Sequence, residues 1–80
     1  MRISGKVVES VIIDNHTSKY TIKSRDGTYI VKAYGKEAIK DYLFIREGQV
    51  VTIEGEVFDR HISKEKAFIS LKLEYRDYND

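Results

Sequence analysis

Residues 19–34, KYTIKSRDGTYIVKAY, contain two alternating apolar and polar runs separated by Asp26 and Gly27. An Asp-Gly pair between alternating runs is a strong hairpin signal, because a two-residue type I′ turn requires positive φ at both central residues. With Asp26 and Gly27 at the centre of the turn, the numbers of paired residues sum to 53. The segment therefore predicts two antiparallel strands.

The two faces of this predicted hairpin differ in chemistry. One face carries the pairs Tyr20–Ala33, Ile22–Val31 and Ser24–Tyr29. The other face, called the basic face below, carries Lys19–Tyr34, Thr21–Lys32, Lys23–Ile30 and Arg25–Thr28. The first face predicts core packing, whereas the basic face presents four cations and an aromatic ring to solvent.

Length and composition indicate one small cytoplasmic domain, expected over residues 1–76 with a frayed tail at 77–80. A chain of 80 residues buries about 60–65% of its unfolded surface. It has no cysteine, no signal-like N-terminus and no apolar run long enough to span a bilayer. The net charge is only +1, but residues 1–36 carry +4 and residues 37–80 carry −3, so positive charge gathers on the half that contains the hairpin.

Strands and one helix account for the rest of the chain. Residues 2–14 are rich in β-branched side chains around Gly5, which predicts a long, bulged first strand. Ile39, Tyr42 and Leu43 lie at helical spacing within residues 36–48, and Gly48 is the expected stop. The remaining segments predict a strand at 49–58, a polar loop at 59–66 and a last strand at 67–75.

Three strands, one helix and two strands, in that order, are typical of an all-β, five-stranded Greek-key barrel of the OB type. The absence of proline, which can protect a strand edge, favours closure of the sheet. An open α+β sheet covered by the helix is the competing fold.

The segment Tyr34–Arg60 resembles the bacterial single-stranded DNA-binding protein family. The matching residues are Tyr34-Gly35-Lys36, Ala38, Gly48, Val51, Ile53-Glu54-Gly55 and Arg60, without a gap. The resemblance implies an OB fold that wraps single-stranded DNA and assembles into oligomers, in which Tyr34 stacks on a base and Arg60 is a basic loop residue. The family's tryptophan falls at or beside Thr28, its aromatic residue after the arginine falls at Ile62, and its long hairpin and acidic tail tip have no counterpart. The chain is therefore more similar to a short relative of the primosomal single-strand-binding kind.

The basic face and its neighbours form the candidate nucleic-acid site. Its expected members are Lys19, Thr21, Lys23, Arg25, Lys32, Tyr34, Lys36, Arg60, His61 and Lys64. Cations that follow phosphates and rings that stack on bases are typical of proteins that bind single strands with little sequence preference. The expected role of such a protein is in DNA replication. The structural alternative is that these lysines only solvate an exposed sheet.

Two other functions stay open. The chain could bind RNA, or it could be a protein-interaction module that docks through strand edges or through Phe58 and Phe68, which fall on the outward parity and suggest a subunit interface. Catalysis is not expected, because His16 and His61 stand alone and no pocket-forming insertion desolvates Glu54 and Glu56. No metal, cofactor, membrane or small-molecule substrate is expected; the expected partners are single-stranded DNA and a second copy of the chain.

Overall fold

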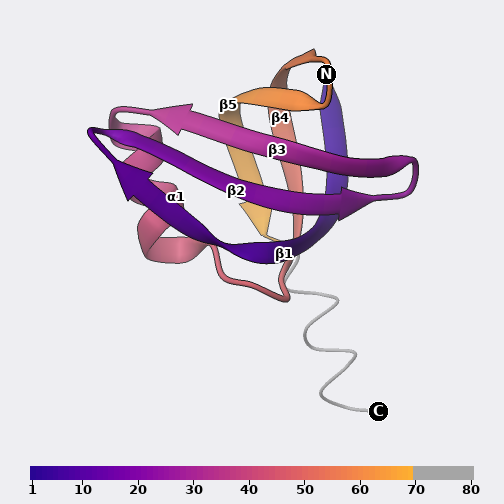
Figure 1. Cartoon of the computed structure of the whole chain (residues 1–80), viewed down its shortest axis with the longest axis horizontal. Coiled ribbons are helices and arrows are strands. Elements are labelled where there is room, and N and C mark those ends of the chain that lie inside the picture. Colours follow the sequence, from indigo (N-terminus) through magenta and orange to yellow (C-terminus); the bar gives the residue numbers. More distant parts are fainter. Residues whose placement is uncertain (70–80) are drawn as a thin grey trace.

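The computed structural model describes residues 1–69, which form a closed five-stranded barrel with one helix (Figure 1). The elements are β1 (Arg2–Asp14), β2 (Thr17–Ser24), β3 (Gly27–Tyr34), α1 (Lys36–Phe44), β4 (Val50–Phe58) and β5 (His61–Ile69). The strand order around the barrel is β1-β2-β3-β5-β4, and β4 returns to β1. This confirms the predicted element order and excludes the open sheet.

Strand β1 is long because it serves two neighbours. Its first residues, Arg2–Lys6, pair with β4, and from Gly5 to Asp14 it pairs with β2, with register shifts between Val7 and Ile12. The predicted bulged first strand is thus confirmed. Gly5 lies where β1 is paired on both sides, and a Cβ there would come within 2.8 Å of the carbonyl oxygen of Lys23. A larger residue would therefore push β1 and β2 apart.

The predicted register of the β2–β3 hairpin is wrong by two positions, although its two faces are right. Ser24 pairs with Gly27, so Arg25 and Asp26 form the turn and paired numbers sum to 51. Within this turn only Gly27 takes a positive φ, 133°, as the first residue of β3, and the Asp26 carboxylate accepts a hydrogen bond from the Tyr29 hydroxyl at 2.8 Å. A shift by two preserves the alternation of side chains, so the apolar and basic faces survive.

Two other hairpin turns have the positive φ values that were expected at Asp26-Gly27. Asn15 and His16 join β1 to β2 with φ of 48° and 62°, and Asp59 and Arg60 join β4 to β5 with φ of 47° and 65°. These are the signs that a type I′ turn requires.

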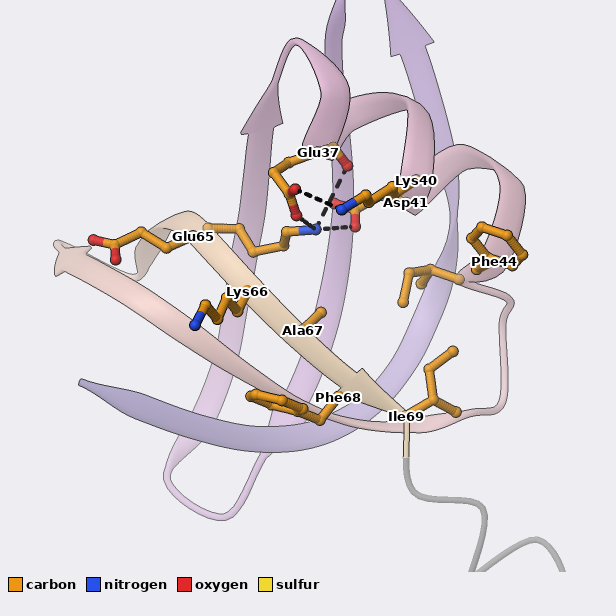
Figure 2. A pocket seen from close by; sticks show the side chains of 11 residues that line it. Glu37, Lys40, Asp41, Phe44, Glu65, Lys66, Ala67, Phe68 and Ile69 are labelled. Atoms are coloured by element: carbon orange, nitrogen blue, oxygen red, sulfur yellow. Dashed lines mark hydrogen bonds and ion pairs between the residues drawn. The ribbon is translucent and has the colours of Figure 1, made fainter.

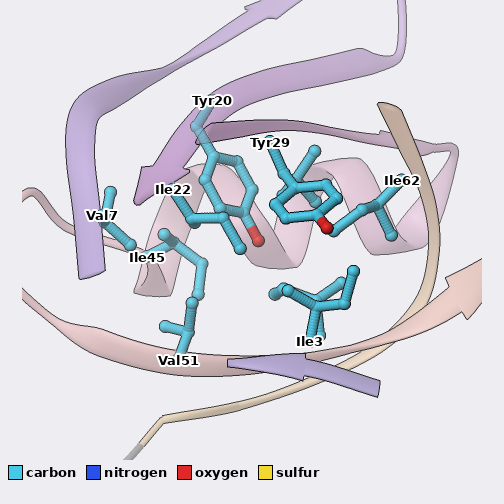
Figure 3. Close-up of a cluster of buried hydrophobic side chains, with 10 residues drawn as sticks. Ile3, Val7, Tyr20, Ile22, Tyr29, Ile45, Val51 and Ile62 are labelled. Atoms are coloured by element: carbon cyan, nitrogen blue, oxygen red, sulfur yellow. The ribbon is translucent and has the colours of Figure 1, made fainter. Parts of the chain in front are cut away.

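The barrel interior is filled by apolar side chains from every strand (Figure 3). The buried cluster consists of Ile3, Val7, Tyr20, Ile22, Tyr29, Val31, Ile45, Val51, Ile53 and Ile62. The rings of Tyr20 and Tyr29 lie among these aliphatic residues, as predicted for the apolar face of the hairpin. Burial of each large side chain stabilises the fold by about 1.5–3 kcal/mol relative to exposure.

The predicted helix is confirmed, and the apolar residues that indicated it lie mostly on its outer side. Ile39, Tyr42 and Leu43 are 46%, 50% and 53% exposed, whereas Ala38 and Asp41 face the barrel. The small Ala38 allows close approach of the helix, and the Asp41 carboxylate finds partners inside, as described below. Helix α1 ends at Phe44, four residues before the predicted stop at Gly48.

The predicted polar loop at 59–66 is also wrong. Strand β5 begins at His61, directly after the two-residue turn, and pairs with β4 through Phe58–His61. Ile62 points into the core, and the next inward residue is Lys64. Because this inward residue is charged, the sequence does not show the alternation of apolar and polar residues that is typical of a strand. The part of the predicted last strand beyond Ile69 and the predicted tail at 77–80 lie outside the described residues.

Candidate nucleic-acid interface

The outer surfaces of β2, β3, β5 and β4 form one continuous sheet surface, because the registers align their outward side chains in rows. One row is Thr21, Ile30, His61 and Phe58, and the next is Lys19, Lys32, Ser63 and Glu56. Since neighbouring strands lie about 4.8 Å apart, each row spans about 14 Å. This surface, called the platform below, extends the basic face across the barrel.

Four predicted cations lie on the platform or at its edge. Lys19, Lys23 and Arg25 are exposed and Lys32 is half-buried, and within residues 1–69 none of the four takes part in an ion pair. Lys19 and Lys32 are directly opposite one another in the β2–β3 ladder. Like charges placed this way are destabilising, and an anion bound between them would relieve the repulsion.

Two exposed aromatic rings flank the platform. Tyr34, at the end of β3, is 58% exposed, and Phe58, at the end of β4, is 82% exposed. Both rings line a groove of about 230 Å³ together with Lys32, Glu56, His61 and Ser63. The sequence interpretation placed Phe58 at a subunit interface, and only the two-residue turn at Asp59-Arg60 brings it beside the basic face.

Arg60 links the tips of two hairpins. Its Nη1 lies 3.7 Å from Oδ2 of Asp26, and its guanidinium carbon lies 4.9 Å from the centroid of the Tyr29 ring. Its carbonyl accepts a 2.8 Å hydrogen bond from the amide of Ile30. The hydrogen bond that Tyr29 donates to Asp26 raises the pKa of the Tyr29 hydroxyl. The Arg60 side chain is half-exposed, so it still meets solvent.

Two further predicted residues border the same surface. Lys36 is exposed at the start of α1, two residues after Tyr34. His61 is exposed, and its Nδ1 donates a hydrogen bond to the carbonyl of Asp59 at 2.9 Å, because a carbonyl oxygen can only accept. The other ring nitrogen, Nε2, therefore stays available for a ligand.

Lys64 does not belong to the platform, and its prediction as a nucleic-acid contact is wrong. Its side chain is only 2% exposed, and Nζ lies 2.5 Å from Oδ1 of Asp41 and 3.1 Å from Oε1 of Glu37. Figure 2 shows Asp41 and Glu37 on α1 directed toward this ammonium group. The ion pair fastens the helix to β5, so the ammonium cannot reach a phosphate.

The pKa values of the two carboxyl groups around Lys64 are shifted in opposite directions. Burial raises the pKa of Asp41, although Lys64 and the Ser18 hydroxyl, 3.3 Å away, favour its charged form. Hydrogen bonds from Lys64 and Lys40 lower the pKa of Glu37, which lies at the surface. The cluster is thus a structural anchor with one strongly desolvated carboxylate.

Metal ligands and membrane-spanning helices are the next features to consider in residues 1–69. No group of three or more His, Cys, Asp or Glu side chains there is arranged to hold a metal ion. Helix α1, the one helix in the described range, is not long and apolar enough to cross a membrane.

A second groove of about 530 Å³ lies between α1 and β5, lined by Phe44, Ala67 and Phe68 among others (Figure 2).

Solved structures with this barrel include proteins that bind single strands. The small single-stranded DNA-binding protein of Streptomyces coelicolor superposes with a TM-score of 0.76 at 12% identity, over 91% of this chain and 94% of that one. The mitochondrial single-stranded DNA-binding protein Rim1 of S. cerevisiae gives 0.72 at 21% identity, over 86% and 90%. This chain has the fold of single-stranded DNA-binding proteins. The resemblance of Tyr34–Arg60 to that family is thereby confirmed for the fold.

The same barrel also occurs as part of a larger protein. TiaS, a tRNA agmatidine synthetase, in complex with tRNA and ATP gives a TM-score of 0.74 at 22% identity. The match covers 85% of this chain but only 17% of TiaS. No family model and no curated protein matches the sequence.

Proposed function

We propose that this protein binds single-stranded DNA with little sequence preference through the platform. The observation that carries the proposal is the gathering, on one continuous sheet surface, of two exposed aromatic rings and four cations that form no ion pair within residues 1–69. Cations that neutralise phosphates supply affinity without sequence preference, and each base stacked on a ring adds about 1–3 kcal/mol. The fold of the Streptomyces and yeast proteins supports the same function.

The residues divide into two roles under this proposal. Lys19, Lys23, Arg25 and Lys32 contact phosphates, and Arg60, Lys36 and His61 extend the positive edge. Tyr34 stacks on a base, and Thr21 offers a hydroxyl between the two lysines of β2. The role is binding rather than catalysis, in the cytoplasm, where replication exposes single strands.

Fluorescence anisotropy with a labelled single-stranded oligonucleotide of mixed sequence tests the proposal. Four phosphate contacts predict that log K falls against log salt with a slope of about −3. The double charge reversal Lys23→Glu with Lys32→Glu should abolish binding, whereas Lys66→Glu, a single charge reversal beside α1, should retain most of it. Tyr34→Ala should weaken binding by about 1–3 kcal/mol without changing the salt slope. Absence of binding at low salt would refute the function.

RNA is the second candidate ligand, because the same barrel occurs in TiaS, whose solved structures include a complex with tRNA. Stacking rings and lysines serve either backbone, and a contact with the 2′-hydroxyl would distinguish them. Anisotropy with the ribo- and deoxyribo-versions of one sequence compares the two ligands directly. A clear preference for the RNA version would redirect the proposal.

A second copy of the chain is the proposed protein partner. From Ile12 to Asp14, β1 pairs with β2 on one side, and no other described strand covers its second edge. Ile12, on this segment, is 65% exposed. Unpaired edges of two copies can pair antiparallel about a two-fold axis, which closes the assembly as a dimer. Light scattering should give twice the monomer mass, and Ile12→Lys should shift it toward the monomer; a monomeric wild type would exclude the dimer.

A further inference from the structure

Glu56 is the one carboxylate among the described side chains that line the groove between Tyr34 and Phe58. In the sheet Glu56 pairs with Ser63 of β5, and Ser63 in turn pairs with Lys32 of β3. Glu56 and Lys32 therefore lie two strands apart, with about 10 Å between their backbones. Within residues 1–69 neither side chain takes part in an ion pair. An exposed carboxylate on this surface repels phosphate, so it must face a different part of the ligand.

We propose, building on the function above, that this groove holds one nucleobase and that Glu56 selects bases carrying an exocyclic amino group. The rings of Tyr34 and Phe58 offer stacking surfaces, and Lys32 is placed for the adjoining phosphate. A carboxylate only accepts hydrogen bonds, so it pairs with the amino groups of cytosine, adenine or guanine. Thymine has a carbonyl oxygen at the equivalent position, which the carboxylate repels.

The selection acts at one position of the bound strand. The contacts elsewhere on the platform are to phosphates and remain indifferent to sequence. Ser63 and His61 line the same groove and can satisfy the remaining polar edge of the base. The protein is therefore a general single-strand binder with a bias against thymine.

Anisotropy with labelled oligo-dC, oligo-dA and oligo-dT of equal length tests this inference. Wild type should bind oligo-dC or oligo-dA about five-fold or more tightly than oligo-dT, the factor that corresponds to one base contact. Glu56→Gln should bring the ratio close to one, because an amide offers both a donor and an acceptor. Phe58→Ala should weaken all three ligands without changing the ratio.

The matched control is Glu54→Gln, which removes the same charge from the same face of β4 but does not line the groove. It should keep the wild-type ratio. Equal affinity of wild type for all three oligonucleotides, or a ratio that survives Glu56→Gln, would overturn the role of Glu56 and leave the proposed function intact. Failure to bind any oligonucleotide, the mixed sequence included, would overturn both.

Discussion

Removal of the Lys64 ammonium should destabilise the barrel strongly and leave the nucleic-acid surface intact. In Lys64→Met the methionine fills similar volume, but the Asp41 carboxylate, 2% exposed, loses its partner at 2.5 Å. Breaking one side of a buried ion pair costs about 3–5 kcal/mol. With an unfolding entropy of about 2.1 cal/mol/K per residue, a chain of this length should melt about 18–30 °C lower.

Thermal unfolding followed by circular dichroism measures this loss, and oligonucleotide binding is measured well below the new melting temperature. The double variant Lys64→Met with Asp41→Leu removes both charges and should recover most of the stability, because a buried pair replaced by apolar residues is often close to neutral. A single variant that melts within a few degrees of wild type would refute the anchoring role. Loss of binding by a folded Lys64→Met would restore Lys64 to the interface.

Three further predictions concern the barrel. Gly55→Ala should destabilise the barrel by about 3 kcal/mol in urea unfolding, because the new Cβ would meet the backbone carbonyl of Ser63. The control Gly48→Ala has open space around the new Cβ but a φ of 94°, so it should cost only about 1–2 kcal/mol. Equal losses for the two variants would contradict the clash with Ser63. Tyr20→Phe should stabilise by about 1 kcal/mol in the same assay, since the buried Tyr20 hydroxyl has no hydrogen-bond partner among the described residues; a loss of stability would reveal one. Glu37 has a lowered pKa, so its ion pairs stabilise the fold above the ordinary pKa of 4.5 and are lost as the pH falls below it. The stability advantage of wild type over Glu37→Gln should therefore shrink on acidification, and an advantage that grows would reverse the sign.

Alternation of side chains predicted the two strands of the hairpin, whose inward residues are mostly apolar. Tyr20, Ile22, Val31 and Ala33 lie in the core as the pattern of the hairpin required. The register was wrong because the positive φ of this turn belongs to Gly27 alone, and Asp26 is held by Tyr29, which no local pattern shows. Alternation thus determines which face of the sheet a side chain occupies, whereas the register depends on the geometry of the turn.

Two errors in the prediction have one physical origin, the buried pair of Asp41 and Lys64. Asp41 occupies the inward side of α1, and its partner on the barrel is Lys64. Lys64 occupies an inward position of β5, so the strand looked like a polar loop and the lysine like a ligand contact. Each charge is buried only because the other one is present, and the two are 23 residues apart.

The candidate site was predicted best where it depends on parity alone. Lys19, Lys23 and Arg25 are exposed as the hairpin required, and Lys32 is on the same face. Phe58 and Glu56 lie in the site because of the β4–β5 register. The sequence analysis could not give this register, because it predicted a loop at residues 59–66. Their roles in binding remain predictions for the experiments above.

The ring of strands is closed between β3 and β5 by only three residue pairs, from Ile30 with His61 to Lys32 with Ser63. This seam runs through the middle of the platform, with Tyr34 of β3 on one side and Phe58 of β4 on the other. A bound oligonucleotide that contacts both sides would stabilise the β3–β5 pairing against opening. Amide exchange at Ile30, whose N–H is bonded to Arg60 across the gap, should therefore slow when the protein is loaded.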